Sequence, residues 1–76
     1  MIEIRFFGQI TDLTKTEKVM IEDIRDTDAM MKKIIEMYPA LANATFKVAV
    51  NNKLVYDNIE IAENSIIAFM PPFSGG

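Results

Sequence analysis

The first seven residues alternate between apolar and polar side chains, as the residues of a half-buried β-strand do. One face of this predicted strand carries Ile2, Ile4 and Phe6. The opposite face carries the charged residues Glu3 and Arg5. By the same alternation Phe7 belongs to the charged face. Gly8 is expected to end the strand, and residues 9–15 are expected to form a loop or turn.

A second strand is expected over residues 17–24. Its pattern places Val19 and Ile21 inward, with Lys18 and Glu22 outward. Because only a short connection separates this strand from the first, the two are expected to pair as a hairpin.

A helix is expected next, and its start is marked by Asp26, Thr27 and Asp28. These side chains can accept hydrogen bonds from the free N–H groups of a first helical turn, and the negative charges suit the helix dipole. Five apolar residues then recur at helical spacing: Met30, Met31, Ile34, Ile35 and Tyr38. We expect them to fill the core. Pro39 is expected to stop the helix, because the residue before a proline disfavours helical geometry.

The second half of the chain contains three further strand candidates, over residues 45–51, 53–56 and 65–70. Asn51-Asn52 favours a turn between the first two, because asparagine tolerates positive φ. Residues 40–44 and 57–64 are expected to be connections.

These strands also alternate. The inward positions of the first are Phe46, Val48 and Val50, and its other face carries Lys47 and Ala49. In the last strand Ile67 and Phe69 share one face. The other face of that strand carries Ile66, Ala68 and Met70.

The order strand, strand, helix, strand, short strand, strand predicts an α+β fold, with one main helix packed on one face of a mixed sheet of four to five strands. The β-grasp (ubiquitin-like) fold fits this order, with the first and last strands adjacent and parallel. We expect a single β-grasp domain over residues 1–70 and a flexible tail over residues 71–76. At 76 residues the chain is too short for a second domain.

Composition excludes several classes of function. The chain has no Cys and no His, which removes disulfides, Cys/His zinc sites and Cys or His catalysis. A net charge of −3 argues against nucleic-acid binding and suggests basic partner surfaces. No signal peptide or bilayer-spanning run is evident, so a cytoplasmic location without membrane contact is expected.

No catalytic constellation is evident either. Gly8 stands alone before the tail, so there is no glycine-rich phosphate loop. Glu60 and Glu63 could bind a metal, but a solvated loop explains them better. We therefore expect no metal site, no cofactor bound by the chain itself, and no catalysis by this domain alone.

The tail carries the clearest signal: Pro71, Pro72, Phe73, Ser74, Gly75 and Gly76. Glycine has no Cβ, so the last two residues could enter a channel too narrow for side chains. Prolines keep the base of the tail extended, and six residues reach up to roughly 20 Å. The carboxylate of Gly76 is a poor electrophile, so an outside activator such as an ATP-derived adenylate would be needed. Once activated, it could accept sulfur or an amine.

The sequence resembles the MoaD family, the small subunits of molybdopterin synthase among the MoaD/ThiS sulfur carriers. The strongest likeness is residues 68–76, an apolar strand followed by Pro-Pro and Gly-Gly. Residues 2–7, residues 48–51 and Leu54-Val55 resemble the family's opening strand and its middle strand and turn. The likeness covers nearly the whole chain.

This resemblance implies a two-stage cycle. A MoeB-like E1 enzyme uses ATP to adenylate Gly76, and a sulfur donor protein converts the adenylate to a thiocarboxylate. A MoaE-like large subunit then delivers the sulfur to cyclic pyranopterin monophosphate in molybdenum cofactor biosynthesis. The resemblance also implies that Pro71 to Gly75 insert into the partner's active site. It implies an apolar docking patch of Phe7, Leu54 and Met70, where Met70 replaces a frequent aromatic residue.

Three alternatives share parts of this interpretation. A ThiS-like carrier for thiamine or tRNA thiolation would use the same Gly76 chemistry, although thiazole carriers usually lack the two prolines. A ubiquitin-like protein modifier would differ only in the attacking nucleophile, which is a lysine amine. A plain interaction domain would not use the tail at all.

Overall fold

Eight helical and strand segments succeed one another in residues 1–72, the part of the chain that the structure, a computed structural model, describes. Along the chain they are β1 (Ile2–Phe6), α1 (Gln9–Thr14), β2 (Lys18–Ile21), α2 (Thr27–Met37), the 3₁₀ helix η1 (Pro39–Asn43), β3 (Lys47–Val50), β4 (Lys53–Val55) and β5 (Ile66–Met70).

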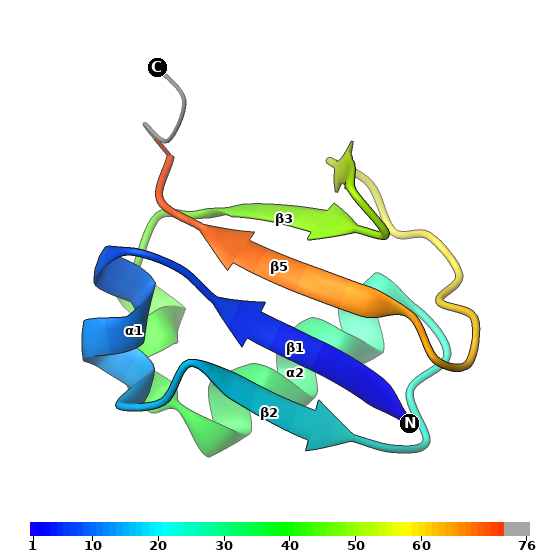
Figure 1. Cartoon of the computed structure of the whole chain (residues 1–76), viewed down its shortest axis with the longest axis horizontal. Helices are drawn as coiled ribbons and strands as arrows, with labels where there is room; N and C mark the ends of the chain where they lie inside the picture. Colours follow the sequence, from blue (N-terminus) through cyan, green and yellow to red (C-terminus); the bar gives the residue numbers. More distant parts are fainter. Residues whose placement is uncertain (73–76) are drawn as a thin grey trace.

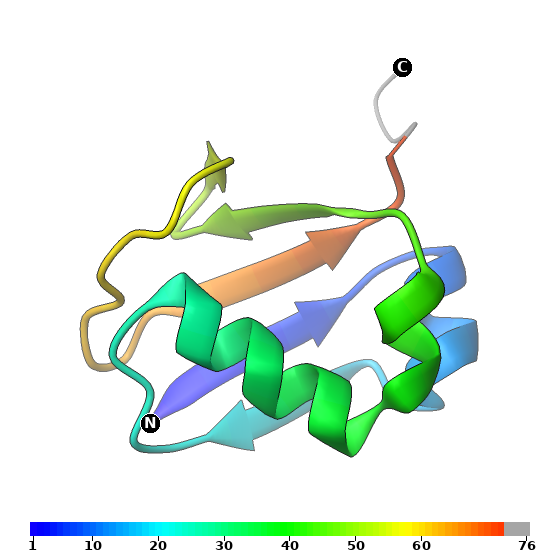
Figure 2. The same ribbon diagram turned by 180° about the vertical axis from the view of Figure 1, so that it is seen from behind.

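The five strands form one mixed sheet in the order β2-β1-β5-β3-β4 (Figure 1). β1 and β5 are parallel neighbours, and every other pair is antiparallel. The first and last strands therefore lie side by side inside the sheet, as expected. α2 crosses one face of the sheet (Figure 2). This arrangement confirms the predicted α+β, β-grasp architecture.

The core lies between α2 and the sheet. The inward side chains of β1 are buried, and they meet Met30 and Ile34 of α2, which are fully buried. On β5, the ring of Phe69 lies 5.6 Å from that of Phe6 and stacks on Phe46 at 5.0 Å. The other predicted apolar positions of the helix pack at the edge of this core as partly buried residues: Met31, Ile35 and Tyr38.

The start of α2 confirms the predicted capping. The Asp26 carboxylate accepts a hydrogen bond from the N–H of Ala29 at 2.9 Å. The side-chain oxygen of Asn58 accepts two more, from the hydroxyl of Thr27 at 2.9 Å and the N–H of Asp28 at 2.8 Å. The helix ends before Pro39, so the proline marks its end as expected.

Residues 9–15 are not the loop that the sequence predicts, because Gln9–Thr14 form the short helix α1. One side of this helix is buried through Ile10 and Thr14. Gly8 before it has φ 54°, and Lys15 after it has a left-handed conformation. A helix this short is not stable alone, so its contacts with the body must hold it in place.

The connection over residues 40–44 is also more regular than expected, because Pro39–Asn43 form the 3₁₀ helix η1. Leu41 of η1 is fully buried, and burial of this side chain explains why the segment folds into a helical turn. The predicted strands over 17–24 and 45–51 are confirmed in position but are shorter, at Lys18–Ile21 and Lys47–Val50.

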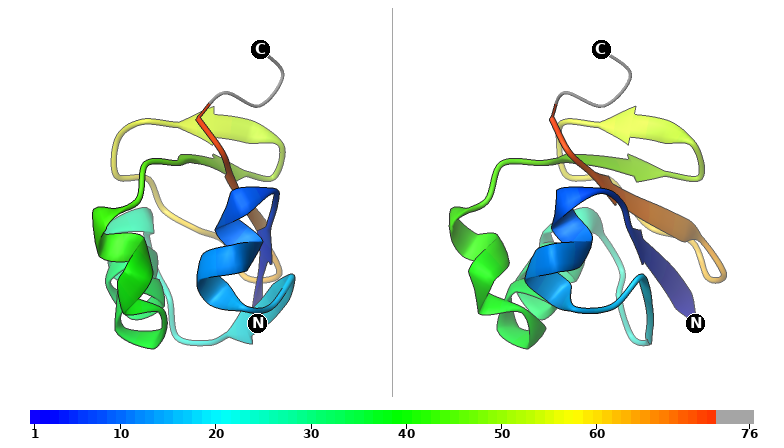
Figure 3. Two further views of the ribbon diagram at one scale, coloured as in Figure 1. Left: turned by 90° about the vertical axis from the view of Figure 1, so that its left-hand side faces the viewer. Right: turned by 60° about the vertical axis from the view of Figure 1, so that its left-hand side comes forward.

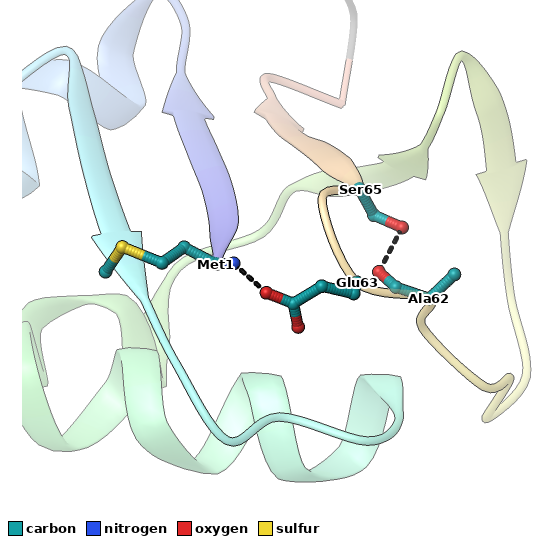
Figure 4. A network of polar contacts seen from close by, with 4 residues as sticks. All are labelled: Met1, Ala62, Glu63 and Ser65. Carbon is teal, nitrogen blue, oxygen red and sulfur yellow. Dashed lines mark hydrogen bonds and ion pairs between the residues drawn. The ribbon is translucent and has the colours of Figure 1, made fainter.

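Polar contacts fix the start of β5 beside the start of β1 (Figure 4). The N-terminal amine of Met1 forms an ion pair with Glu63, and the Ser65 hydroxyl donates a hydrogen bond to the Ala62 carbonyl at 2.7 Å. Within the backbone, the N–H of Glu3 donates to the Ser65 carbonyl at 3.1 Å. The ion pair and the Glu3–Ser65 bond join the start of β1 to the start of β5, and the Ser65–Ala62 bond closes the turn before β5.

Candidate docking face and tail base

One face of the sheet is left without a covering helix in the described part of the chain. Figure 3 shows α2 and η1 on one side of the sheet and open space on the other. The residues of β1 and β5 that point away from α2 therefore form an exposed surface, which we call the open face. The helices of residues 1–72 are also too short and too polar to cross a membrane.

Phe7 and Met70 lie at the same end of the neighbouring strands β1 and β5. The pairing of β1 with β5 matches Phe6 with Phe69, and the N–H of Phe7 donates to the Phe69 carbonyl at 3.0 Å. This bond belongs to the Phe6–Phe69 pairing and holds Phe7, the next residue of the chain, at the end of β5. The side chain of Phe7 is 45% exposed, and Met70 is half-buried. The structure thus brings together two of the three residues predicted for the docking patch.

Leu54 lies on the same face of the sheet, because strand pairing connects it to two alanines of that face. Ala49 of β3 pairs with Leu54 on one side and with Ala68 on the other, and directly paired residues share a face. Leu54 is 43% exposed. Of the two alanines, Ala49 is almost fully buried and Ala68 is half-buried. All three predicted patch residues therefore lie on the open face.

Two more exposed apolar residues extend this surface away from the tail. Glu3 pairs with Ile66 on one side and with Met20 on the other, so all three lie in one row. Alternation in the sequence already places Ile66 on the face of Ala68 and Met70. The patch predicted from the sequence does not include Met20. Its outward position follows from alternation, because it lies between the inward residues Val19 and Ile21.

The charge of the open face differs from that of the whole chain. Its outward cations are Arg5, Lys18 and Lys47. Lys47 pairs with Met70, and Arg5 forms an ion pair with Glu3. Many of the carboxylates lie instead in the loops before α2 and before β5. The net charge of −3 therefore does not describe the face that carries the apolar patch, and basic partner surfaces do not follow from it.

Pro71 and Pro72 form the base of the tail, directly after β5, and both are half-buried. They line a groove together with residues of α1 and of the connection before β3: Gly8, Gln9, Ile10, Leu13, Ala44 and Thr45. The base of the tail thus starts beside Phe7 and Met70. The remaining predicted site residues, Phe73, Ser74, Gly75 and Gly76, lie outside the described residues.

The two carboxylates considered as a metal site have other contacts. Glu63 pairs with the N-terminal amine, and Glu60 lies in an isolated bridge with Asp26. Among residues 1–72 there is no group of three or more carboxylate, Cys or His side chains that could hold a metal ion.

The sequence matches the model of the ThiS family over residues 4–76. Among solved structures, SAMP1 from Haloferax volcanii has the same fold, with a TM-score of 0.79 and 17% identity over 99% of this chain and 98% of that one. A putative molybdopterin converting factor subunit 1 from Pyrococcus furiosus gives a TM-score of 0.80 with 14% identity, over 93% and 95% of the two chains.

A third similar structure is the protein–protein complex of subunits 1 and 2 of the molybdopterin-converting factor from Helicobacter pylori. It gives a TM-score of 0.73 with 26% identity over 99% of this chain and 97% of that one. The family match extends from β1 through the two terminal glycines. The protein therefore belongs to the ThiS family, the ThiS/MoaD-like sulfur carriers of ubiquitin fold.

Proposed function

We propose that this protein is the sulfur-carrying small subunit of a molybdopterin synthase and that it works through the carboxylate of Gly76. In the first stage a MoeB-like enzyme binds the carrier and ATP. A carboxylate oxygen of Gly76 forms a bond to the α-phosphorus of ATP, and pyrophosphate leaves. A sulfide equivalent (HS⁻) from a donor protein then attacks the acyl carbon of Gly76, AMP leaves, and a thiocarboxylate forms on the carrier. ATP is used by the enzyme and is not a resident ligand of this chain.

In the second stage the charged carrier meets a MoaE-like large subunit. Phe7, Leu54 and Met70 dock the body, and the segment from Pro71 to Gly75 places the sulfur in the partner's active site. The acceptor is cyclic pyranopterin monophosphate. The catalytic groups belong to the two partner enzymes, and this chain contributes the reacting acyl group and the arm that carries it.

The observation that carries this proposal is the family match, which extends to Gly76, together with a tail base that starts beside an exposed apolar face. The body and the tail can therefore engage one partner at the same time. The Helicobacter pylori complex supports a large-subunit partner, because its molybdopterin-converting subunits are bound to each other.

A protein modifier is the second candidate, because SAMP1 of Methanosarcina acetivorans, a small archaeal modifier protein, has the same fold with a TM-score of 0.81. Its 16% identity supports the fold alone. In this alternative a lysine amine, rather than sulfur, would displace AMP from the activated Gly76. A ThiS-like carrier for thiamine or tRNA thiolation would form the same thiocarboxylate and differ in the acceptor.

The test is intact mass spectrometry after incubation with ATP, a MoeB-family enzyme and a sulfur source. We expect one oxygen to be replaced by sulfur, and we expect neither a chain that lacks Gly76 nor a chain with one added residue to be charged. The charged carrier is then mixed with a MoaE-family subunit and cyclic pyranopterin monophosphate, which should yield molybdopterin. Conjugates with other proteins would instead support the modifier, and charging of the extended chain would contradict the use of Gly76.

A further inference from the structure

Gly8 and Pro71 touch at the point where the tail leaves the body. Gly8 follows β1, Pro71 follows β5, and these strands are parallel neighbours, so both chain segments leave the sheet at the same end. A Cβ atom added to Gly8 would lie 2.7 Å from Cγ and 3.4 Å from Cδ of Pro71. The first distance is shorter than any ordinary contact between carbon atoms, so the proline ring occupies the space that a side chain at position 8 would need.

The backbone around Gly8 is held from both sides. The N–H of Phe7 is bonded to Phe69, and the Gly8 carbonyl accepts a hydrogen bond from the N–H of Thr11 at 3.1 Å. The Thr11 hydroxyl donates to the Phe6 carbonyl at 3.1 Å. Because β1, α1 and β5 all fix this turn, Gly8 cannot easily move away from the proline. Its φ of 54° is also a conformation that other residues rarely adopt.

We infer that Gly8 is a positioning residue for the tail, because its missing side chain leaves the space in which Pro71 sits and so sets the direction in which the tail leaves the body. This inference rests on the proposed function, in which the tail must enter a partner's site while the patch stays docked. It also gives α1 a purpose, since Ile10 and Leu13 of that helix form one wall of the groove at the tail base.

We expect a side chain at position 8 to impair the entry of the tail into the partner's active site and to leave the docking of the body unchanged. With a methyl group at position 8, the distance between the new Cβ and Cγ of Pro71 must grow from 2.7 Å to at least 3.0 Å, or the turn must deform. A misplacement of about 1 Å of a reacting group can cost about 100-fold in rate. The N–H of Phe7 remains bonded to the Phe69 carbonyl, so the patch of Phe7, Leu54 and Met70 should stay in place and the affinity of the body for its partner should hardly change.

A double-mutant cycle separates this effect from the cost of positive φ. The four proteins are the natural chain, Gly8→Ala, Pro71→Ala and the pair G8A/P71A. The strain of alanine at φ 54° is present in both backgrounds, so it cancels in the cycle, whereas the clash with Cγ and Cδ exists only when Pro71 is present. Each protein is charged by a MoeB-family enzyme and ATP in single-turnover reactions, and its affinity for that enzyme is measured separately.

We expect Gly8→Ala to charge at least about tenfold more slowly with unchanged affinity, and G8A/P71A to charge as fast as Pro71→Ala alone. Equal charging rates of the natural chain and Gly8→Ala would overturn the inference. So would a slow rate that Pro71→Ala does not relieve, or a loss of affinity that accounts for the slow rate.

Thermal unfolding of all four proteins is followed in parallel. If Gly8→Ala does not fold, the natural chain still provides a test, because nuclear Overhauser contacts between the Gly8 α-protons and the Pro71 ring protons are expected. Their absence would overturn the inference. Failure of the natural chain to be charged at all would contradict the proposed function instead, whether or not the Gly8–Pro71 contact is found.

Discussion

The N–H of Phe7 donates a hydrogen bond to the carbonyl oxygen of Phe69 at 3.0 Å, one residue beyond the end of β1. This bond holds Phe7 at the end of β5, where Met70 and then Pro71 follow. The candidate docking patch and the base of the tail therefore begin at the same place. Even so, they should be separable by mutation, because one acts through affinity and the other through the position of the tail.

Phe7→Asp is expected to weaken binding to both the MoeB-like enzyme and the MoaE-like subunit by at least about tenfold, or about 1.4 kcal/mol. The proposed complex buries the ring of Phe7. A carboxylate at this position would have to lose its hydrating water when the complex forms. Isothermal titration calorimetry measures this effect. Met37→Asp is the matched control. Met37 is 39% exposed, but it is the last residue of α2 and so lies on the side of the sheet opposite to the open face. Equal losses for both variants would remove the patch from the proposal.

Gly75→Val is expected to lower the single-turnover charging rate of Gly76 by about 100-fold, because a branched side chain would not pass a channel that admits glycine. Binding of the body should stay intact, so the variant should act as a competitive inhibitor of charging of the natural chain. Ser74→Ala keeps a small side chain one position earlier and serves as the control. A charged Gly75→Val protein, formed at the normal rate, would show that the channel is not narrow.

Phe69→Ala is expected to lower the free energy of unfolding by about 3–5 kcal/mol. Phe69 lies on a central strand, is fully buried and packs against the rings of Phe6 and Phe46. For a small domain this is a large share of a total stability of about 5–15 kcal/mol. Urea denaturation followed by circular dichroism measures it. Tyr56→Ala, at a position that is 80% exposed, should change stability by no more than about 0.5 kcal/mol.

Asp26→Ala is expected to cost about 0.5–2 kcal/mol of unfolding free energy, because the N–H of Ala29 loses its acceptor at the start of α2. Asp26→Asn keeps a side-chain oxygen at the same position and should be nearly neutral. The same urea experiment compares the two variants. If both were equally destabilised, the negative charge would matter more than the cap.

The parts of the fold that the sequence predicts well are those in which one face is buried and the other is wet. Ile4 and Phe6 are fully or almost fully buried, and their alternation with Glu3 and Arg5 is visible in the sequence. β5 is apolar throughout, so its inward residues, Ile67 and Phe69, follow from strand parity and not from a polar pattern. The pairing of β1 with β5 joins residues 63 positions apart, such as Glu3 and Ile66, which local patterns do not encode. It was expected from the order of elements and the fold that this order fits.

The short helix α1 escaped prediction because its inward positions are Ile10 and Thr14, and threonine gives no apolar signal. Its limits depend on backbone geometry at Gly8 and Lys15, and a lysine in a left-handed conformation has no sequence signature. The position of Leu54 was equally hard to predict. A strand of three residues has too little alternation to define its faces, so only the pairing with Ala49 places Leu54 on the open face.

Parallel pairing of β1 with β5 has a consequence for how the protein is made. The inner part of the sheet cannot form until residues 66–70 have been synthesised, because β1 has no second neighbour before then. A nascent chain that stops earlier would leave Phe6 without the ring of Phe69 and β1 without its parallel neighbour, so the central strand pair would be missing. Folding of the body is therefore coupled to the synthesis of β5, the strand that directly precedes Pro71.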